Sequence, residues 1–193
     1  KVDNRFVAEG TETPMIPRVG LRMQLSEILN DLTYYGRGPE ENYRDRRTSQ
    51  FIGEYTTPIK DLYEPYIRPQ ENEHHTDIYW CALTTKQKAG LLFIADRTFE
   101  LNASNYLLGS LDSGETIDNG APRTNETNHR HLTDPQPVKQ VDMFIDYRMM
   151  GVGGDNSWGA IAHEPYLIRP GVENTIEYGF SIVPFDKKAD YKN

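Results

Sequence analysis

The residues best suited to contact a ligand lie in the segment Tyr147–Tyr166, which reads YRMMGVGGDNSWGAIAHEPY. Three glycines, an acid, an amide and a hydroxyl directly precede Trp158, one of only two tryptophans in the chain. Glycine adds backbone freedom that ordering must remove, so the segment is predicted to form a loop instead of a strand or helix. The alternative is that Trp158 is a core residue inserted beneath this loop.

Other residue types that often carry chemistry do not form a recognisable site. The glycine-rich segment lacks the lysine of a phosphate-binding loop, and its serine is not centred as in a nucleophile elbow. His129 and His131 would share one face of an extended segment and could pair on a metal, but the spacing identifies no third ligand. A hydrogen-bonded pair is therefore favoured, and His74, His75 and His163 are likewise interpreted as structural residues.

The segment Tyr34–Ser49, YYGRGPEENYRDRRTS, combines charges with aromatic rings. Four arginines alternate with three acids, and three tyrosines accompany them. A guanidinium can pair with a carboxylate through two hydrogen bonds at once, so such a loop can hold itself in one shape or dock a neighbouring domain. A solvated loop would explain the charges but not the aromatic rings. Ordering or docking is therefore favoured, and a catalytic role is not.

The composition excludes several classes of protein and site. The 193 residues are consistent with a single domain over 1–193, and 29 acids against 21 lysines and arginines give a net charge of -8, which argues against a nucleic-acid partner. The single cysteine, Cys81, excludes an intrachain disulfide and a multi-cysteine zinc site, and it is predicted to be a buried thiol. No apolar run of about 18 residues is present, so no membrane span is expected.

Alternation of apolar and polar residues predicts an all-β fold. In RVGLRMQL, residues 18–25, Val19 and every second residue after it face one way, while Arg18 and its set face the polar side. Continuous apolar runs indicate strands covered on both faces. The 15 glycines and 12 prolines interrupt the chain often enough for many short antiparallel strands. Further strands are predicted near the first residues and at 77–83, 90–95, 139–149 and 174–184.

The remaining segments give weaker expectations. Leu25–Leu32 fits a turn or two of amphipathic helix, and Leu108–Pro137 is polar enough to form an extended surface loop. The opening residues KVDNRFVAEG show neither an initiator methionine nor a signal-peptide pattern, so the chain is interpreted as a fragment cut from a longer protein. Asn102 and Asn125 match the glycosylation triplet, a match that is interpreted as chance.

Four motifs, in this order and spacing, resemble one known family. They are GRGPEENYRDR (36–46), YIRPQEN (66–72), NHRHL (128–132) and MGVGGDNSWG (150–159). From about Pro17 to about Pro184 the chain resembles the C-terminal domain, also called the small chain or domain 5, of the large retaining β-galactosidases. The resemblance implies a galactose-mutarotase-like β-supersandwich of two large antiparallel sheets, with N-terminal strands missing from this fragment. The chain departs from the family at Asn156, where a second aspartate is common, and in the longer 108–137 region.

The same resemblance implies a function for the parent protein and a role for this chain. The parent hydrolyses terminal non-reducing β-D-galactosides such as lactose with retention, and its catalytic carboxylates belong to a barrel domain. Trp158 would form an apolar platform for the sugar at the active-site mouth, with Asp155 and Asn156 also binding substrate. The expected partners are the other domains and further copies of the parent, in a bacterial cytoplasm or periplasm. No catalytic residue, cofactor or metal is expected in this chain.

Two alternative functions stay open from the sequence. The chain could be a free-standing carbohydrate-binding or assembly module, which would bind sugar or assemble into oligomers without other domains. It could also be a galactose-mutarotase-like epimerase, which requires an acid/base pair. His131 with a nearby glutamate is the only pair that the sequence offers for this chemistry.

Overall fold

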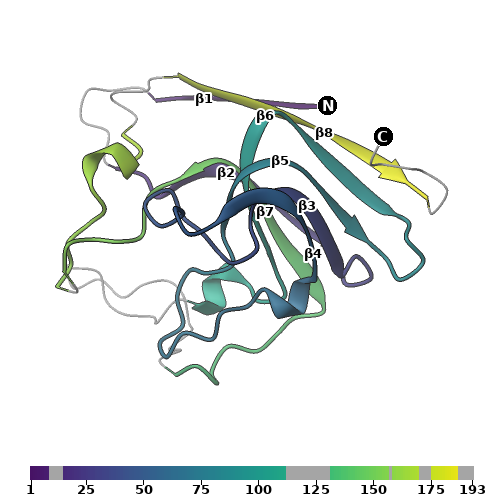
Figure 1. Ribbon diagram of the computed structural model, residues 1–193, viewed down its shortest axis with the longest axis horizontal. Coiled ribbons are helices and arrows are strands. Elements are labelled where there is room, and N and C mark those ends of the chain that lie inside the picture. Colours follow the sequence, from purple (N-terminus) through teal and green to yellow (C-terminus); the bar gives the residue numbers. More distant parts are fainter. Residues whose placement is uncertain (9–14, 112–130, 157, 170–174, 187–193) are drawn as a thin grey trace.

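The computed structural model describes residues 1–8, 15–111, 131–156, 158–169 and 175–186. These residues form eight β-strands and three short 3-10 helices, with no α-helix in the ranges given (Figure 1). The predicted all-β class is confirmed. Within the same ranges, the helices are too short or too polar to span a membrane. The elements are β1 (Val2–Val7), β2 (Arg18–Ser26), β3 (Asp31–Gly38), β4 (Phe51–Pro58), η1 (Ile59–Asp61), β5 (His75–Thr84), β6 (Gly90–Ser104), η2 (Leu108–Leu111), β7 (Gln140–Met149), η3 (Glu164–Tyr166) and β8 (Thr175–Phe185).

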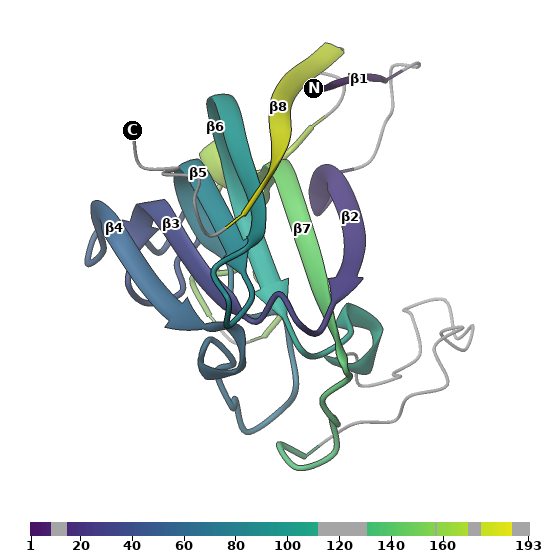
Figure 2. The same cartoon turned by 90° about the vertical axis from the view of Figure 1, so that its right-hand side faces the viewer.

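The eight strands belong to one antiparallel sheet that forks at β6. The main path runs β1-β8-β6-β5-β3-β4, and β7 pairs with both β6 and β2 off this path. The first part of β6, Gly90–Ala95, pairs with β8, whereas Glu100–Ser104 pairs with β7. The described strands thus form one continuous forked sheet, consistent with a β-sandwich, and the 15-residue β6 carries both branches (Figure 2).

One face of this sheet encloses the main hydrophobic core. Tyr34, Cys81 and Phe93 are direct partners across β3, β5 and β6, and all three are fully buried. Side chains at directly opposite positions point to the same face of a sheet, so this row fixes which face is inside. Cys81 is the buried thiol that the sequence predicted, and burial raises its pKa. The cluster continues through Leu32, Ile59, Ile78, Leu83, Phe99, Leu101, Ala103, Val141, Met143, Ile145 and Phe180.

The predicted helical turn at Leu25–Leu32 is wrong. Strand β2 continues to Ser26, a turn follows, and β3 begins at Asp31. Leu32 is fully buried because it lies in a ladder between β4 and β5, opposite Thr57 and Leu83. Pairing on both edges and burial outweigh a helical pattern that covers only eight residues.

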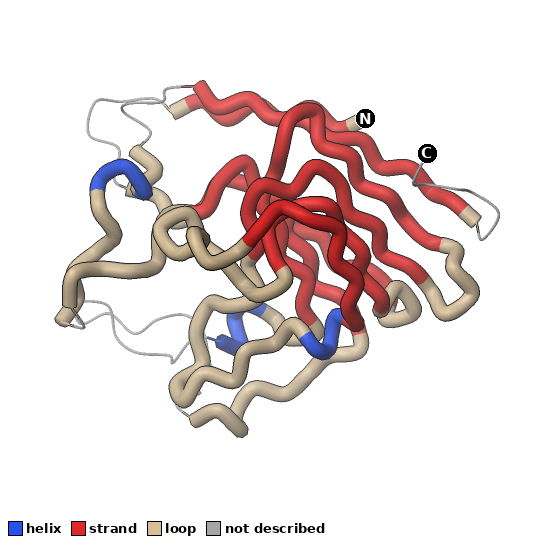
Figure 3. Tube along the Cα trace, viewed as in Figure 1, coloured by secondary structure: helices blue, strands red, loops and turns tan. Residues whose placement is uncertain are grey.

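The predictions for the 108–137 loop and for the two glycosylation triplets can be compared with the structure in part. In the predicted 108–137 loop, the first four residues form η2, whereas residues 112–130, including Asn125 and His129, lie outside the described residues. Asn102 is buried in β6 and its amide donates to the Asn72 carbonyl at 2.7 Å, so the folded chain does not offer it for glycosylation. The longer loops gather at the left and lower side of the sheet in Figure 3, where the candidate site also lies.

Candidate functional site

Trp158 lies on an exposed loop, Gly151–His163, called the Trp158 loop below. This loop follows β7, precedes η3, and has no strand or helix in its described residues, as predicted. Trp158 is 93% exposed, so the alternative of a core residue beneath the loop is wrong. Val152 and Ile161 are also exposed. The loop therefore presents an indole and further apolar groups to its surroundings instead of burying them.

The base of the Trp158 loop is held by one carboxylate from a distant segment. Val152 N donates to Asp45 Oδ1 at 3.2 Å, and Gly153 N donates to Asp45 Oδ2 at 2.7 Å. Gly151 N donates to the Tyr166 carbonyl at 2.8 Å, which joins the start of the loop to η3. These hydrogen bonds fix the direction in which the loop leaves β7.

Two glycines are required by the path of the loop itself. A Cβ at Gly154 would lie 2.2 Å from the carbonyl oxygen of Ala160, so glycine is needed where the two arms of the loop touch. Gly159 has a φ of 93°, a conformation that residues with a side chain rarely adopt. The chain therefore turns back immediately after Trp158, which leaves the indole at the exposed end of the loop.

The polar residues predicted to accompany Trp158 lie beside it on this loop. Asn156 Oδ1 accepts a hydrogen bond from Trp158 N at 2.8 Å, an Asx-turn contact that fixes the local backbone. Asp155 Oδ1 lies 2.8 Å from His163 Nε2, which links the two arms of the loop. The structure places the three predicted site residues on one loop, together with His163, which contacts Asp155.

Asp45 belongs to the loop between β3 and β4, Pro39–Gln50, which is fixed from inside by Asn42. The fully buried Asn42 side chain accepts hydrogen bonds from Thr76 N at 3.0 Å and Thr76 Oγ1 at 2.6 Å. Its amide nitrogen donates to two nearby carbonyl groups, each at 3.0 Å. The prediction that this segment orders itself is confirmed, and its contact with the Trp158 loop shows that it also docks a neighbouring segment.

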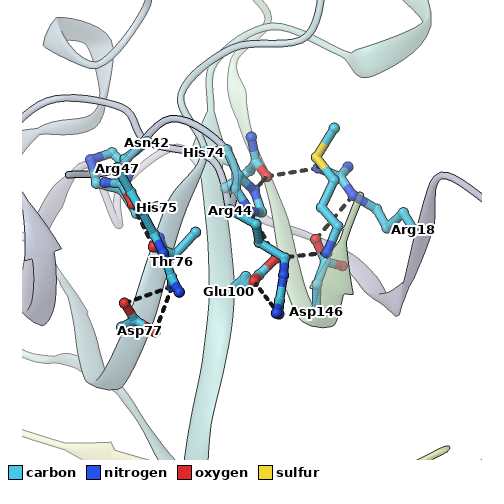
Figure 4. Close-up of polar contacts among 12 residues, drawn as sticks. Arg18, Asn42, Arg44, Arg47, His74, His75, Thr76, Asp77, Glu100 and Asp146 are labelled. Carbon is cyan, nitrogen blue, oxygen red and sulfur yellow. Dashed lines mark hydrogen bonds and ion pairs between the residues drawn. The ribbon is translucent and has the colours of Figure 1, made fainter. Parts of the chain in front are cut away.

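The arginines of this segment pair with acids on both sides of the loop. Arg37 and Arg47 both bind the Asp77 carboxylate, with nitrogen–oxygen distances of 2.8 to 3.0 Å; the Arg47 contact is drawn in Figure 4. Arg46 pairs with Glu41. Asp77 lies where β5 bulges away from a regular pairing with β6. The loop is therefore held against β5 by charge as well as by the buried amide.

A buried charged cluster lies next to this loop and was not predicted from the sequence. His74 Nε2 lies 3.0 Å from Glu100 Oε2, and Arg18 Nε lies 3.0 Å from Asp146 Oδ2 (Figure 4). Arg44, from the β3–β4 loop, reaches Glu100 at 3.6 Å. Alternation placed Arg18 on the polar side of its strand, yet its side chain is only 13% exposed and that of Asp146 is 0% exposed. The polar side of β2 is thus covered at this point.

The two adjacent histidines have the structural roles that the sequence favoured. Burial lowers the pKa of His74, but the hydrogen bond to Glu100 and its charge outweigh this, so the net pKa is raised. Burial lowers the pKa of His75, whose ring nitrogens contact the carbonyls of Glu73 and Pro39 at 3.0 and 3.2 Å. His74 therefore pairs with Glu100 inside the cluster, and His75 joins the segments that contain Glu73 and Pro39.

Glu73 gives the stability of the chain a predicted pH dependence. Burial raises the pKa of this side chain from 4.5 to about 8. Because the folded pKa lies above the unfolded one, the folded state binds the proton more tightly, and the free energy of unfolding should fall as the pH rises from about 4.5 to about 8. Glu73→Gln should remove this part of the decline. Urea unfolding of both proteins across this range measures it, and identical pH profiles would contradict the assignment.

No second site emerges from the other predicted candidates. The described part of the chain contains no group of three or more His, Cys, Asp or Glu residues that could hold a metal ion. His131 is exposed, and its backbone amide donates to Asp134 Oδ2 at 2.9 Å. Among the described residues no hydrogen bond or ion pair joins His131 to a glutamate.

Sequence comparison places this fold and loop in a known family. The family described as Beta galactosidase small chain matches residues 1–182. A "Beta-galactosidase" of Priestia megaterium is 33% identical over 162 residues, which cover 84% of this chain and 14% of that protein. The corresponding "Beta-galactosidase" of Streptococcus thermophilus is 29% identical over 174 residues, 90% of this chain and 15% of that protein. That of Vibrio cholerae is 31% identical over 158 residues, 82% of this chain and 13% of that protein.

The match covers nearly all of this chain but only a small part of each relative. The chain spans about one seventh of the length of the curated relatives it matches. The matched region includes the β3–β4 loop, the Trp158 loop and most of β8. The chain belongs to the β-galactosidase small chain family.

Proposed function

We propose that this chain is the C-terminal domain of a β-galactosidase that hydrolyses terminal non-reducing β-D-galactosides with retention. In this proposal the Trp158 loop supplies an apolar platform to the mouth of an active site formed elsewhere in the enzyme. The observation that carries the proposal is the 93% exposure of Trp158 on a loop whose backbone is hydrogen-bonded at its base. A large apolar group held rigidly in an exposed position is suited to contact a partner or ligand.

The chemistry of the loop suits a sugar. A pyranose presents a patch of C–H groups on one face, which an indole can cover, while its hydroxyls need hydrogen-bonding partners. Asp155 and Asn156 provide carboxylate and amide groups on the same loop, and His163 adds an imidazole. Galactose, or the galactosyl part of lactose, would therefore find an apolar surface and polar groups within one segment.

The residues of this chain support a binding role instead of a catalytic one. Retaining hydrolysis uses two carboxyl groups about 5–5.5 Å apart, one as nucleophile and one as acid/base. Asp155 is the only acid in the sequence of the Trp158 loop. Asp45 is engaged by backbone amides, and Asp146 is buried beside Arg18. We therefore assign the catalytic pair to another part of the enzyme.

The purified 193-residue chain is expected to leave a chromogenic β-galactoside unhydrolysed, because the proposal assigns that carboxylate pair to another part of the enzyme. Release of the chromophore is measured by absorbance, with the full-length enzyme as the positive control under the same conditions. The control variant is the chain carrying Asp155→Asn, which tests the one loop acid directly. Turnover that persists through purification and disappears in this variant would show that catalysis resides in the chain after all.

A free-standing carbohydrate-binding module is the second candidate, and the exposed indole also favours it. Such a module should bind sugar without any other domain. Titrating the isolated chain with lactose while following tryptophan fluorescence distinguishes the two, with Trp158→Phe as the control that removes the reporter. Saturable quenching by the isolated chain supports the module, whereas binding only in the full-length enzyme supports the platform at a shared site.

A further inference from the structure

We infer that Asp45 is a positioning residue for the sugar-contacting loop: its carboxylate holds the Trp158 loop in its binding geometry without touching substrate. This inference rests on the proposed function of Trp158. Asp45 lies in the β3–β4 loop, more than a hundred positions before the tryptophan, and its two oxygens reach two consecutive amides at the base of the Trp158 loop.

Both oxygens of the Asp45 carboxylate accept hydrogen bonds from the backbone of the Trp158 loop. Oδ1 accepts from Val152 N at 3.2 Å, while Oδ2 accepts from Gly153 N at 2.7 Å. Hydrogen bonds to an ionised acceptor are roughly twice as strong as neutral ones. Two bonds to neighbouring amides restrict both the position and the direction of this stretch of backbone. The path from Gly153 to Trp158 thus begins at a fixed point.

The glycines at the base of the loop are explained by the same carboxylate. A Cβ at Gly151 would lie 2.6 Å from Asp45 Cγ and Oδ2, and one at Gly153 would lie 3.1 Å from Oδ2. Neither glycine has the positive φ that would by itself require glycine, in contrast to Gly159. Close approach of the Asp45 carboxylate therefore favours glycine at 151 and 153, and at 151 the Ala162 Cβ, 2.9 Å from the same position, adds to this.

Asp45 is itself held in place by the core. Tyr43 N donates to the Arg46 carbonyl at 3.1 Å, and Arg46 N donates to the Tyr43 carbonyl at 2.8 Å, so Asp45 lies in a closed turn between them. Tyr43 is buried, and its ring stacks on that of His74 with centroids 5.2 Å apart. His74 belongs to the buried charged cluster. A chain of contacts therefore runs from the core through this turn to the Trp158 loop.

The test uses the full-length enzyme carrying Asp45→Asn, which preserves size but replaces one acceptor oxygen with a donor and removes the charge. KM for a chromogenic β-galactoside is expected to rise about tenfold with a smaller change in kcat, because the indole is no longer held where the sugar binds. Gly151→Ala places a methyl group 2.6 Å from the same carboxylate and 2.9 Å from Ala162 Cβ, and it should give the same KM effect. Glu27→Gln, which removes an exposed acid between β2 and β3, is the matched control and should leave KM unchanged.

A double-mutant cycle separates positioning from general damage. If Asp45 acts through the indole, Asp45→Asn combined with Trp158→Ala should be no worse in KM than Trp158→Ala alone. Independent, additive effects in the double variant would overturn the inference, as would a normal KM in both Asp45→Asn and Gly151→Ala while Trp158→Ala raises it. A fall in melting temperature without the change in KM would show a purely structural role and count equally against it. A normal KM in Trp158→Ala would instead reject the proposed function.

Discussion

Trp158→Ala is expected to raise the KM of the full-length enzyme about tenfold, equivalent to roughly 1.4 kcal/mol of lost binding, and to leave its melting temperature unchanged. The indole is 93% exposed, so its removal opens no cavity in this domain. Truncating a buried tryptophan would instead cost roughly 3–5 kcal/mol of stability. An indole that only stacks on bound sugar stabilises ground state and transition state alike, so KM should change more than kcat. Steady-state kinetics and thermal melting of one variant measure both effects.

A fall in kcat as well would add a role for the same side chain. It would indicate that stacking also orients the leaving group for protonation. Trp80→Ala is the matched control, because Trp80 is half-buried on β5 and its loss should lower the melting temperature without raising KM. Unchanged KM and kcat in Trp158→Ala, at an unchanged melting temperature, would remove Trp158 from the site.

Local chemistry made part of this arrangement predictable from the sequence. The alternation from Arg18 to Leu25 marked β2 to within one residue, because side chains in a strand point to alternate faces wherever it pairs. The Trp158 loop was predictable for a similar reason, because the requirements for glycine arise within the loop itself. Gly154 is needed for its contact with Ala160, and Gly159 for its positive φ. Asn156 also acts locally, on an amide two residues away.

Contacts between distant segments were not predictable in this way. The continuous apolar run predicts a strand at Gly90–Ala95 but neither its continuation to Ser104 nor its change of partner, since the partners β7 and β8 lie far along the chain. Asp45 looked like one more charge in an arginine-rich loop, and its partner Val152 is 107 positions away. Asp45 and the glycines of the Trp158 loop belong to separate sequence motifs. Only the folded structure shows that Gly151 and Gly153 leave space for the Asp45 carboxylate.

The buried charged cluster was not predictable from the sequence for a different reason. A period of two assigns each residue to a face of the sheet but does not say what covers that face. Arg18 lies on the polar side of β2, yet it is enclosed by Asp146, Glu71 and Asn102, with its guanidinium 4.3 Å from the centre of the Phe144 ring. Burial raises the pKa of Asp146 to about 7, and the positive charge of Arg18 opposes that rise. Removing the arginine therefore removes the largest charge that favours the ionised form of this buried acid.

Arg18→Ala is accordingly expected to lower the free energy of unfolding by roughly 3–5 kcal/mol, the range for a buried ion pair that loses one partner. Urea unfolding of the purified chain measures this loss. Arg5→Ala is the matched control, since Arg5 pairs with Glu177 across β1 and β8 with both side chains at least 65% exposed, and such a pair contributes about 0–1 kcal/mol. Adding Asp146→Asn to Arg18→Ala should restore part of the loss, because a buried acid that ionises at a cost is replaced by a neutral amide. An Arg18→Ala chain no less stable than Arg5→Ala would mean that the Arg18–Asp146 pair, which joins β2 to β7, does not stabilise the chain.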